Sequence, residues 1–183
     1  MKHYLGEFMH KFKKIIISLL CFIMPGCSNN IIQNSNQKPH LNLKNFFNGN
    51  LDGWGIVFDY RGRQVKSFHV NMKGSWQGNQ GLLKEWFEFD DGVKTTRDWR
   101  INFSDEQNFT AQAGDVVGSA VGIQQGNTVN VKYILKIPYG KRELEVKMDD
   151  WMYLVKEGVV LNRTSMKKFG FKVGELFICM KKK

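Results

Sequence analysis

Two oppositely charged side chains stand within the aromatic and aliphatic stretch LLKEWFEFDDGVKTTRDWRINF, residues 82–103. The alternation predicts two β-strands joined by a turn. A two-residue turn would place Glu85 opposite Asp98, and like charges directly across a strand pair are destabilising. A three-residue loop at residues 90–92, with its glycine in the left-handed conformation, places Glu85 opposite Arg97 instead. We therefore expect a carboxylate and a guanidinium on the more apolar face of this hairpin.

Two kinds of chemistry fit such a pair. Glu85 and Arg97 could form a buried ion pair that fixes the strand register, which requires good geometry to offset desolvation. Alternatively, Arg97 could line a cavity and bind the head group of an amphiphile, for example the carboxylate of a fatty acid. Trp99, on the same face of its strand, would line that cavity too. The two interpretations are compatible.

A second hairpin repeats the device at residues 149–163, DDWMYLVKEGVVLNR. With KEG as a three-residue loop, the facing pairs are Val155 and Val159, Tyr153 and Leu161, and Trp151 and Arg163. A guanidinium can stack on an aromatic ring, so the face with Trp151 and Arg163 is a second candidate ligand-binding region. The opposite face of the hairpin is nearly as apolar, so the sequence does not decide which face points inward.

Asp149 and Asp150 are candidates for acid/base catalysis, which often uses paired carboxylates. Adjacent strand residues point to opposite faces, so both enter one cavity only if the strand is bulged. No nucleophile elbow and no glycine-rich phosphate loop occurs in the sequence. No cysteine or histidine cluster has metal-ligand spacing, so we expect neither a metal nor a cofactor.

The elements that position these residues are alternating segments that follow one another about every dozen residues from residue 46 onward. They predict an all-β fold of eight to ten antiparallel strands with at most a short helix. The best helical candidate is TSMKKFG at 164–170, which we expect to form a short helix or a turn. Such a meander forms either a sandwich or an up-and-down barrel. We favour the barrel, because closure removes both sheet edges and leaves room for one small ligand.

The N-terminal part predicts export. A basic leader precedes an apolar run of ten residues, IIISLLCFIM, which is too short to span a bilayer, since that needs roughly 20 residues. We expect residues 1–26 to be a lipoprotein signal peptide, 27–45 a flexible polar tether, and 46–183 the barrel domain. Met9 is an alternative start to Met1.

Cys27 stands where bacterial lipoprotein signals carry the acylated cysteine, although Met24 and Pro25 depart from the usual pattern before it. Ser28 is typical of outer-membrane sorting. We therefore expect a lipid anchor at Cys27 on the periplasmic face of the outer membrane. Cys21 would leave with the signal peptide, so Cys179 has no disulfide partner.

The formal charge of the chain is +10, of which the leader supplies +3 through four lysines and Glu7, leaving about +7. A basic surface near a membrane favours anionic lipid head groups. Nucleic acid is the other usual partner of a basic protein. We do not expect it here, because an exported chain would not meet it.

Four separated motifs, DGVKTTRDWRI, AGDVVGSAVGIQQGN, DDWMYLVKEGVVLNR and MKKFGFKVGE, resemble the bacterial lipoprotein family known as domain of unknown function 3833. The resemblance covers residues 46–180. It implies an exported lipoprotein with a lipocalin-like barrel, and it marks the matching positions as candidates for the family's activity: Arg97, Trp99, Asp115, Asp149, Asp150, Trp151, Asn162 and Arg163.

The function we expect is binding of a hydrophobic ligand, a fatty-acyl chain or similar lipid, in the barrel cavity. The ligand-binding residues would be Glu85, Arg97, Trp99, Trp151, Tyr153 and Arg163. One alternative is an enzyme that acts on a lipid-derived substrate through Asp149 or Asp150 with an arginine. Another is a structural envelope protein with a filled core. The sequence does not predict the oligomeric state.

Overall fold

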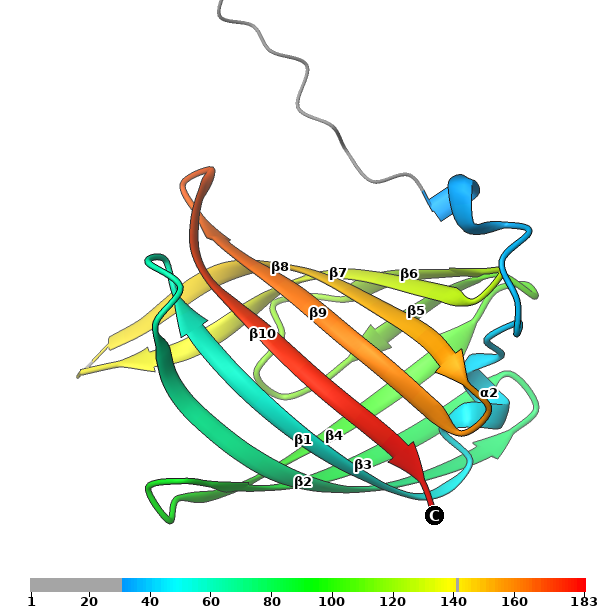
Figure 1. The fold of residues 1–183 in the computed structure, drawn as a ribbon, viewed down its shortest axis with the longest axis horizontal. Coiled ribbons are helices and arrows are strands. Elements are labelled where there is room, and N and C mark those ends of the chain that lie inside the picture. Colours follow the sequence, from blue (N-terminus) through cyan, green and yellow to red (C-terminus); the bar gives the residue numbers. More distant parts are fainter. Residues whose placement is uncertain (1–30, 141) are drawn as a thin grey trace, which may run out of the picture. The chain divides into compact units, whose positions relative to one another are not determined.

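Ten antiparallel strands form a closed barrel in the computed structural model, which describes residues 31–140 and 142–183 (Figure 1). The strand order is β1-β10-β9-β8-β7-β6-β5-β4-β3-β2, an up-and-down meander closed by pairing of β1 with β10. The predicted all-β barrel is therefore confirmed. The strands are β1 (Gly49–Asp59), β2 (Gln64–Gln77), β3 (Gln80–Phe89), β4 (Lys94–Phe103), β5 (Asn108–Gln112), β6 (Ala120–Gln125), β7 (Thr128–Tyr139), β8 (Arg142–Lys156), β9 (Val159–Lys168) and β10 (Phe171–Lys182).

Alternation of apolar and polar residues decides which side chains enter the barrel. In β2, Phe68, Val70 and Met72 are buried in the core, whereas Asn71 and Lys73 between and beside them are exposed. Closure by the β1–β10 pair leaves neither strand with a free edge. The inner residues of all strands thus share one enclosed core.

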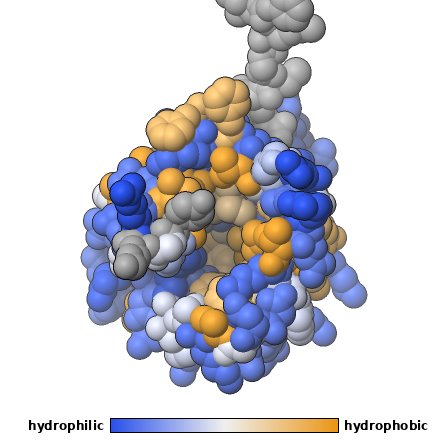
Figure 2. Space-filling view, turned by 90° about the vertical axis from the view of Figure 1, so that its left-hand side faces the viewer, coloured by the Kyte–Doolittle hydropathy of each residue, from blue (hydrophilic) through white to orange (hydrophobic). Residues whose placement is uncertain are grey.

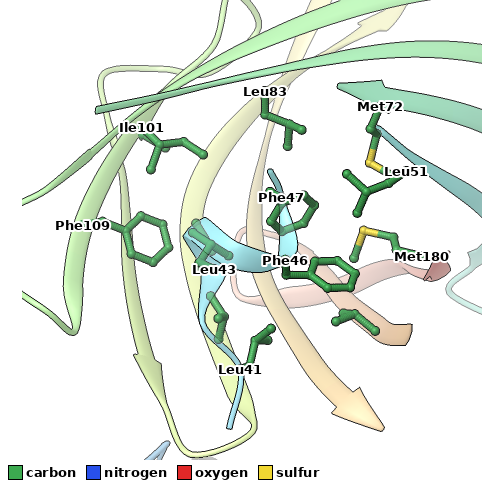
Figure 3. Packing of buried hydrophobic residues seen from close by; sticks show 14 of the residues in the cluster. Leu41, Leu43, Phe46, Phe47, Leu51, Met72, Leu83, Ile101, Phe109 and Met180 are labelled. Atoms are coloured by element: carbon green, nitrogen blue, oxygen red, sulfur yellow. The ribbon is translucent and has the colours of Figure 1, made fainter. Parts of the chain in front are cut away.

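One end of the barrel is closed by the chain segment that precedes β1. This segment contains η1 (Ile31–Asn34) and the short helix α2 (Leu43–Phe46). Figure 3 shows the side chains of this segment packed against inner residues of the barrel. The residues of the segment that belong to the core cluster are Leu41, Leu43, Phe46 and Phe47, and those facing them include Leu51, Met72, Leu83, Ile101, Phe109 and Met180.

We call this segment, residues 31–48, the plug, and hydrogen bonds hold it in place. The Leu41 N–H donates to the Gly126 carbonyl at 2.8 Å, and the Leu43 N–H donates to Gln124 Oε1 at 2.9 Å. The Asn42 side chain caps α2 by accepting from the Asn45 N–H at 2.9 Å. The N–H groups of Leu41 and Leu43 thus have hydrogen-bond acceptors although their residues are buried. The tether was expected to cover residues 27–45, but Leu41 and Leu43 within it belong to the packed domain.

The other end, which carries the connections that follow the odd-numbered strands, is open; we call it the mouth. Figure 2 looks onto this end and shows a hollow whose wall and edge carry hydrophobic residues. No helix among the described residues is long and apolar enough to cross a membrane.

The register of the β3–β4 hairpin confirms the predicted three-residue loop. Phe89 and Val93 face each other, Gly92 is left-handed with φ 79°, and Glu85 pairs with Arg97. In the β8–β9 hairpin, the pairs Tyr153 with Leu161 and Trp151 with Arg163 are confirmed.

Two local predictions were wrong. The ladder shifts between Leu154 and Lys156, so Lys156 rather than Val155 pairs with Val159, and the turn is shorter than expected. The segment 164–170 is not helical, because it forms the end of β9 and the following turn. Residues 164–167 pair with β8 on one side and with β10 on the other. This pairing within the sheet outweighs the weak local preference for a helix.

Candidate functional site

Glu85 on β3 and Arg97 on β4 face the inside of the barrel. Leu83, two residues before Glu85 and therefore on the same face of β3, belongs to the core, and Arg97 pairs with Glu85. Arg97 Nη1 lies 3.8 Å from Glu85 Oε2. The guanidinium carbon is 5.6 Å from the ring centre of Phe87 and 5.7 Å from that of Trp99. Aromatic faces at this distance attract a cation. The predicted cluster of Glu85, Arg97 and Trp99 is thus assembled on the inner face.

The closest partner of Arg97 is Asp115, in the connection between β5 and β6. Asp115 Oδ2 accepts from Arg97 Nε at 2.9 Å and from Nη2 at 2.7 Å. The connection is held against β7, because the Val117 N–H donates to the Ile134 carbonyl and the Lys136 N–H to the Asp115 carbonyl. These bonds fix Asp115 where it reaches the guanidinium. Alternation could not indicate Asp115, since it lies outside the strands; only the family resemblance pointed to it.

Polar groups from β7, β8 and β9 extend the site. Asp150 faces inward opposite Val131 of the core, and its carboxylate accepts from the Asn162 amide. Thr164 donates to Asn162 Oδ1 at 3.2 Å, and Tyr133 packs edge-on against Trp99 at 5.5 Å between ring centres. We call Glu85, Arg97, Asp115, Tyr133, Asp150 and Asn162 the interior polar cluster.

Burial shifts the pKa values within the cluster. Desolvation raises the pKa of Glu85 to about 7, although the Arg97 charge opposes the shift. Desolvation likewise raises the pKa of Asp150 to about 6. Burial alone would lower the pKa of Arg97, but the nearby acidic groups, Glu85 foremost, outweigh burial and raise it. Arg97 therefore stays charged, while two carboxyl groups titrate close to neutral pH.

The cluster holds more acidic groups than basic ones. Glu85, Asp115 and Asp150 surround Arg97 alone, and the buried oxygens Glu85 Oε2 and Asp115 Oδ1 have no hydrogen-bond donor among the described residues. Buried acceptors without a donor are costly. The side chain of Arg97 retains 23% of its accessible surface, so it is not sealed off from the hollow. The site can therefore take a further hydrogen-bond donor.

The second predicted group of site residues lies on the outside. Arg163 is 59% exposed and donates to Glu175 Oε1 at 2.7 Å. Trp151, which is itself buried, and Tyr153 stack on the same outer side of the sheet, with ring centres 6.3 Å apart. These three side chains therefore do not line the barrel interior, where the sequence pattern placed them. The inner face of this hairpin is formed instead by Leu154, Val160 and Asn162, which are buried. Hydrophobicity could not distinguish the two faces, because both carry large apolar residues.

Asp149 and Asp150 point to opposite sides of β8, as the strand geometry requires. Asp149 Oδ1 accepts from Asn130 Nδ2 at 2.8 Å on the outer face, whereas Asp150 belongs to the interior polar cluster. The two carboxylates therefore share no cavity. Within residues 31–140 and 142–183, no three His, Cys, Asp or Glu side chains are grouped so that they could hold a metal ion.

A family model described as a protein of unknown function, DUF3833, matches residues 21–182. The chain belongs to this family. The match includes every strand of the barrel and the plug segment. No curated protein matches the chain. The DUF3833 description gives no activity.

Proposed function

We propose that this DUF3833 protein is a lipid-anchored envelope protein that binds a hydrophobic ligand, such as a fatty-acyl chain or similar lipid, in the barrel. The observation that carries the proposal is an apolar hollow that is open at the mouth (Figure 2), is closed by the segment with α2 at the other end (Figure 3), and contains a charged cluster. Ligand pockets commonly combine apolar walls with a few polar groups that orient the ligand.

The apolar wall would bind the chain of the ligand. Several inner hydrophobic residues are only partly buried although they pack against the core. Covering them with a ligand would remove apolar surface from water, at about 0.8 kcal/mol per buried methylene. These residues are Val57, Trp76, Phe87, Phe89, Trp99, Tyr133, Met152, Leu176 and Ile178.

The polar cluster would orient the head group. Arg97 is already bonded twice to Asp115, and Glu85 and Asp150 add further acidity around it. A ligand carboxylate would have to compete with these groups for Arg97. A hydroxyl or ammonium group would instead donate to the carboxylates that lack a partner. The charge balance thus favours a neutral or cationic head group over a carboxylate.

Export and anchoring rest on the sequence alone. The expected signal peptide, residues 1–26, and Cys27 lie outside the described residues. Their pattern supports acylation at Cys27 and attachment to the periplasmic face of the outer membrane. Mass spectrometry of the protein from its own envelope tests both, since acylation adds a defined mass to the residue that becomes the N-terminus.

The binding proposal is tested with three ligands that share one chain: dodecanol, dodecylamine and dodecanoate. Calorimetry on the detergent-free protein should show binding of all three, with dodecanoate the weakest at pH 8. Failure of every ligand to bind would reject the cavity as a lipid site. Binding of dodecanoate as the tightest ligand would keep the lipid site and reject the proposed head group.

Variants separate the chain from the head group. Arg97→Met should change the order of the three ligands, because it removes the only cation of the cluster among the described residues. Arg163→Met, on the outer face, is the matched control and should leave the order unchanged. Identical effects of both variants would exclude a direct role of Arg97.

An enzyme is the second candidate, favoured by the raised pKa of Asp150. A carboxyl group with a pKa of about 6 in an accessible hollow is suited to accept a proton near neutral pH. The geometry supports Asp150 and not Asp149 in that role, with Arg97 as its electrostatic partner. If a lipid substrate is turned over, Asp150→Asn should abolish turnover and Asp149→Asn should not. A purely structural protein with a filled core fits the hollow of Figure 2 least well.

A further inference from the structure

Two neighbouring hairpins at the mouth expose large apolar side chains. The β9–β10 and β1–β2 hairpins are adjacent, because β1 pairs with β10. Phe169 is 87% exposed and Phe171 is 76% exposed, and Tyr60 and Val65 on the other hairpin are exposed as well. In Figure 2 hydrophobic side chains gather at the upper edge of the hollow. We call residues 60–65 and 167–173 the lip.

The tip of the lip has an unfavourable backbone for its side chain. Phe169 has φ 50° and is followed by Gly170 with φ 83°. Asn or Gly fits the first position of such a turn, whereas a bulky residue is strained there. The Phe169 ring gains almost no burial in return. The fold therefore gives no account of this residue, and strain of this kind is found at binding sites.

Basic residues surround these exposed rings. The lip contains Arg61, Arg63, Lys167, Lys168 and Lys172, and Lys168 Nζ lies 5.0 Å from the centre of the Phe169 ring. The nearby acids are already paired, Asp59 with Arg63 and Glu175 with Lys172. The β3–β4 hairpin at the same end carries the acidic Asp90 and Asp91 in its turn. Positive charge is thus concentrated where the aromatic residues protrude.

We propose that the lip docks on an anionic phospholipid bilayer. Phe169 and Phe171 would enter the boundary between head groups and acyl chains, and the lysines and arginines would bind lipid phosphates. Protruding apolar residues flanked by cations suit a bilayer surface, to which each basic residue adds about fivefold in affinity. The proposal stands on the lip alone. If the hollow binds a lipid as proposed above, docking would place its opening at the membrane.

Site-resolved labelling of lysine amines in the full-length protein tests the docking. The protein is mixed with vesicles of equal parts phosphatidylglycerol and phosphatidylcholine, or of phosphatidylcholine alone, and labelling rates are read by mass spectrometry. With anionic vesicles, Lys167, Lys168 and Lys172 should be labelled severalfold more slowly. Lys84 on the wall and Lys156 at the far end should keep their rates. Attachment through the N-terminal segment would not single out the lip lysines, so the contrast between them and the two control lysines reports on the lip.

Matched variants identify the residues responsible. The double variant Phe169→Asn and Phe171→Ser should restore the labelling of the lip lysines; it relieves the backbone strain at residue 169, so folding is not at risk. Val155→Ser, which changes an exposed apolar residue at the opposite end, should leave the protection intact. Unchanged lip rates, equal slowing of every lysine, or equal protection by neutral vesicles would each overturn the proposal. None of these readouts depends on a ligand in the hollow.

Discussion

Glu85 and Arg97 face each other inside the barrel, but Arg97 is bonded more closely to Asp115. The distance from Arg97 to Glu85 is 3.8 Å, whereas its two bonds to Asp115 measure 2.7 and 2.9 Å. Glu85 is therefore a buried carboxyl group that its cation stabilises incompletely, and its pKa is raised to about 7. This division of one guanidinium between two acids leads to three predictions, and the packing of the plug leads to a fourth.

Glu85 should make the stability of the protein fall as the pH rises. Its usual pKa of 4.5 is raised to about 7 in the folded state, so the folded protein keeps this proton when the unfolded chain has lost it. The unfolding free energy therefore decreases between pH 4.5 and 7, by up to about 3 kcal/mol, and the loss is complete above pH 7. Glu85→Gln cannot ionise and should lack this decrease.

Urea unfolding of both proteins at pH 5 and pH 8 measures the effect. The variant should gain stability relative to the parent protein at pH 8, with little difference at pH 5. Asp149→Gln, on the outer face, serves as the control for a general effect of charge. Parallel pH profiles of parent and Glu85→Gln would contradict the raised pKa.

Arg97→Ala should destabilise the fold strongly. It removes the cation from three acidic groups that remain buried or partly buried, which typically costs about 3–5 kcal/mol. Arg163→Ala offers a matched comparison, since Arg163 also binds a carboxylate but is exposed, and such a pair contributes about 0–1 kcal/mol. Chemical unfolding at pH 8 should separate the two variants clearly. A similar small loss for both would mean that water solvates the interior acids adequately.

The strands could be predicted because alternation is visible along each segment. The β3–β4 register could be predicted because it depends on side chains that face each other within one hairpin. The Glu85–Asp98 alternative was unfavourable from pair electrostatics alone, which left one register. The β8–β9 hairpin lacked such a criterion. Its two faces are about equally apolar, and only the closed sheet decides that Asn162 points inward and Arg163 outward.

The plug and Asp115 could not be predicted from periodicity, because neither belongs to a strand. Leu41 and Leu43 stand in a polar, Asn-rich segment, and two apolar residues in such a segment do not reveal that they fill the end of a barrel. Their burial depends on contacts with residues far away in the sequence. The same holds for Asp115, which backbone bonds to β7 bring beside Arg97.

Gly74→Ala should disturb the plug. A Cβ atom at this position would lie 1.5 Å from the carbonyl oxygen of Phe47, so the backbone of the plug would have to move. That carbonyl also accepts from Trp76 Nε1 at 3.3 Å. We expect a loss at or above the upper end of the ~1–3 kcal/mol range for overpacking. Thermal or urea unfolding checks this.

Gly114→Ala is the matched control for that substitution. Nothing lies within 4 Å of a Cβ atom there, so the variant should be as stable as the parent protein or slightly more stable. Equal stability of Gly74→Ala and the parent would show that the plug can shift without cost. In that case α2 would be a loosely attached segment.

Asp115→Asn should change which head group the barrel prefers. The substitution removes one negative charge beside Arg97 and weakens the two bonds that occupy the guanidinium. Arg97 then becomes available to a ligand carboxylate, while an ammonium group loses an acceptor. Relative to the parent protein, dodecanoate should gain and dodecylamine should lose affinity, on the order of tenfold between them. Dodecanol should change least, since it carries no charge.

The matched control for head-group preference is Asp149→Asn, which removes the same charge from the outer face of β8. A through-space effect of net charge would shift the ligand order in both variants. A direct effect at the site should appear in Asp115→Asn alone. If neither variant alters the order of the three affinities while all three ligands still bind, the apolar wall holds the alkyl chain of the ligand. The head group then lies outside the interior polar cluster, in the mouth.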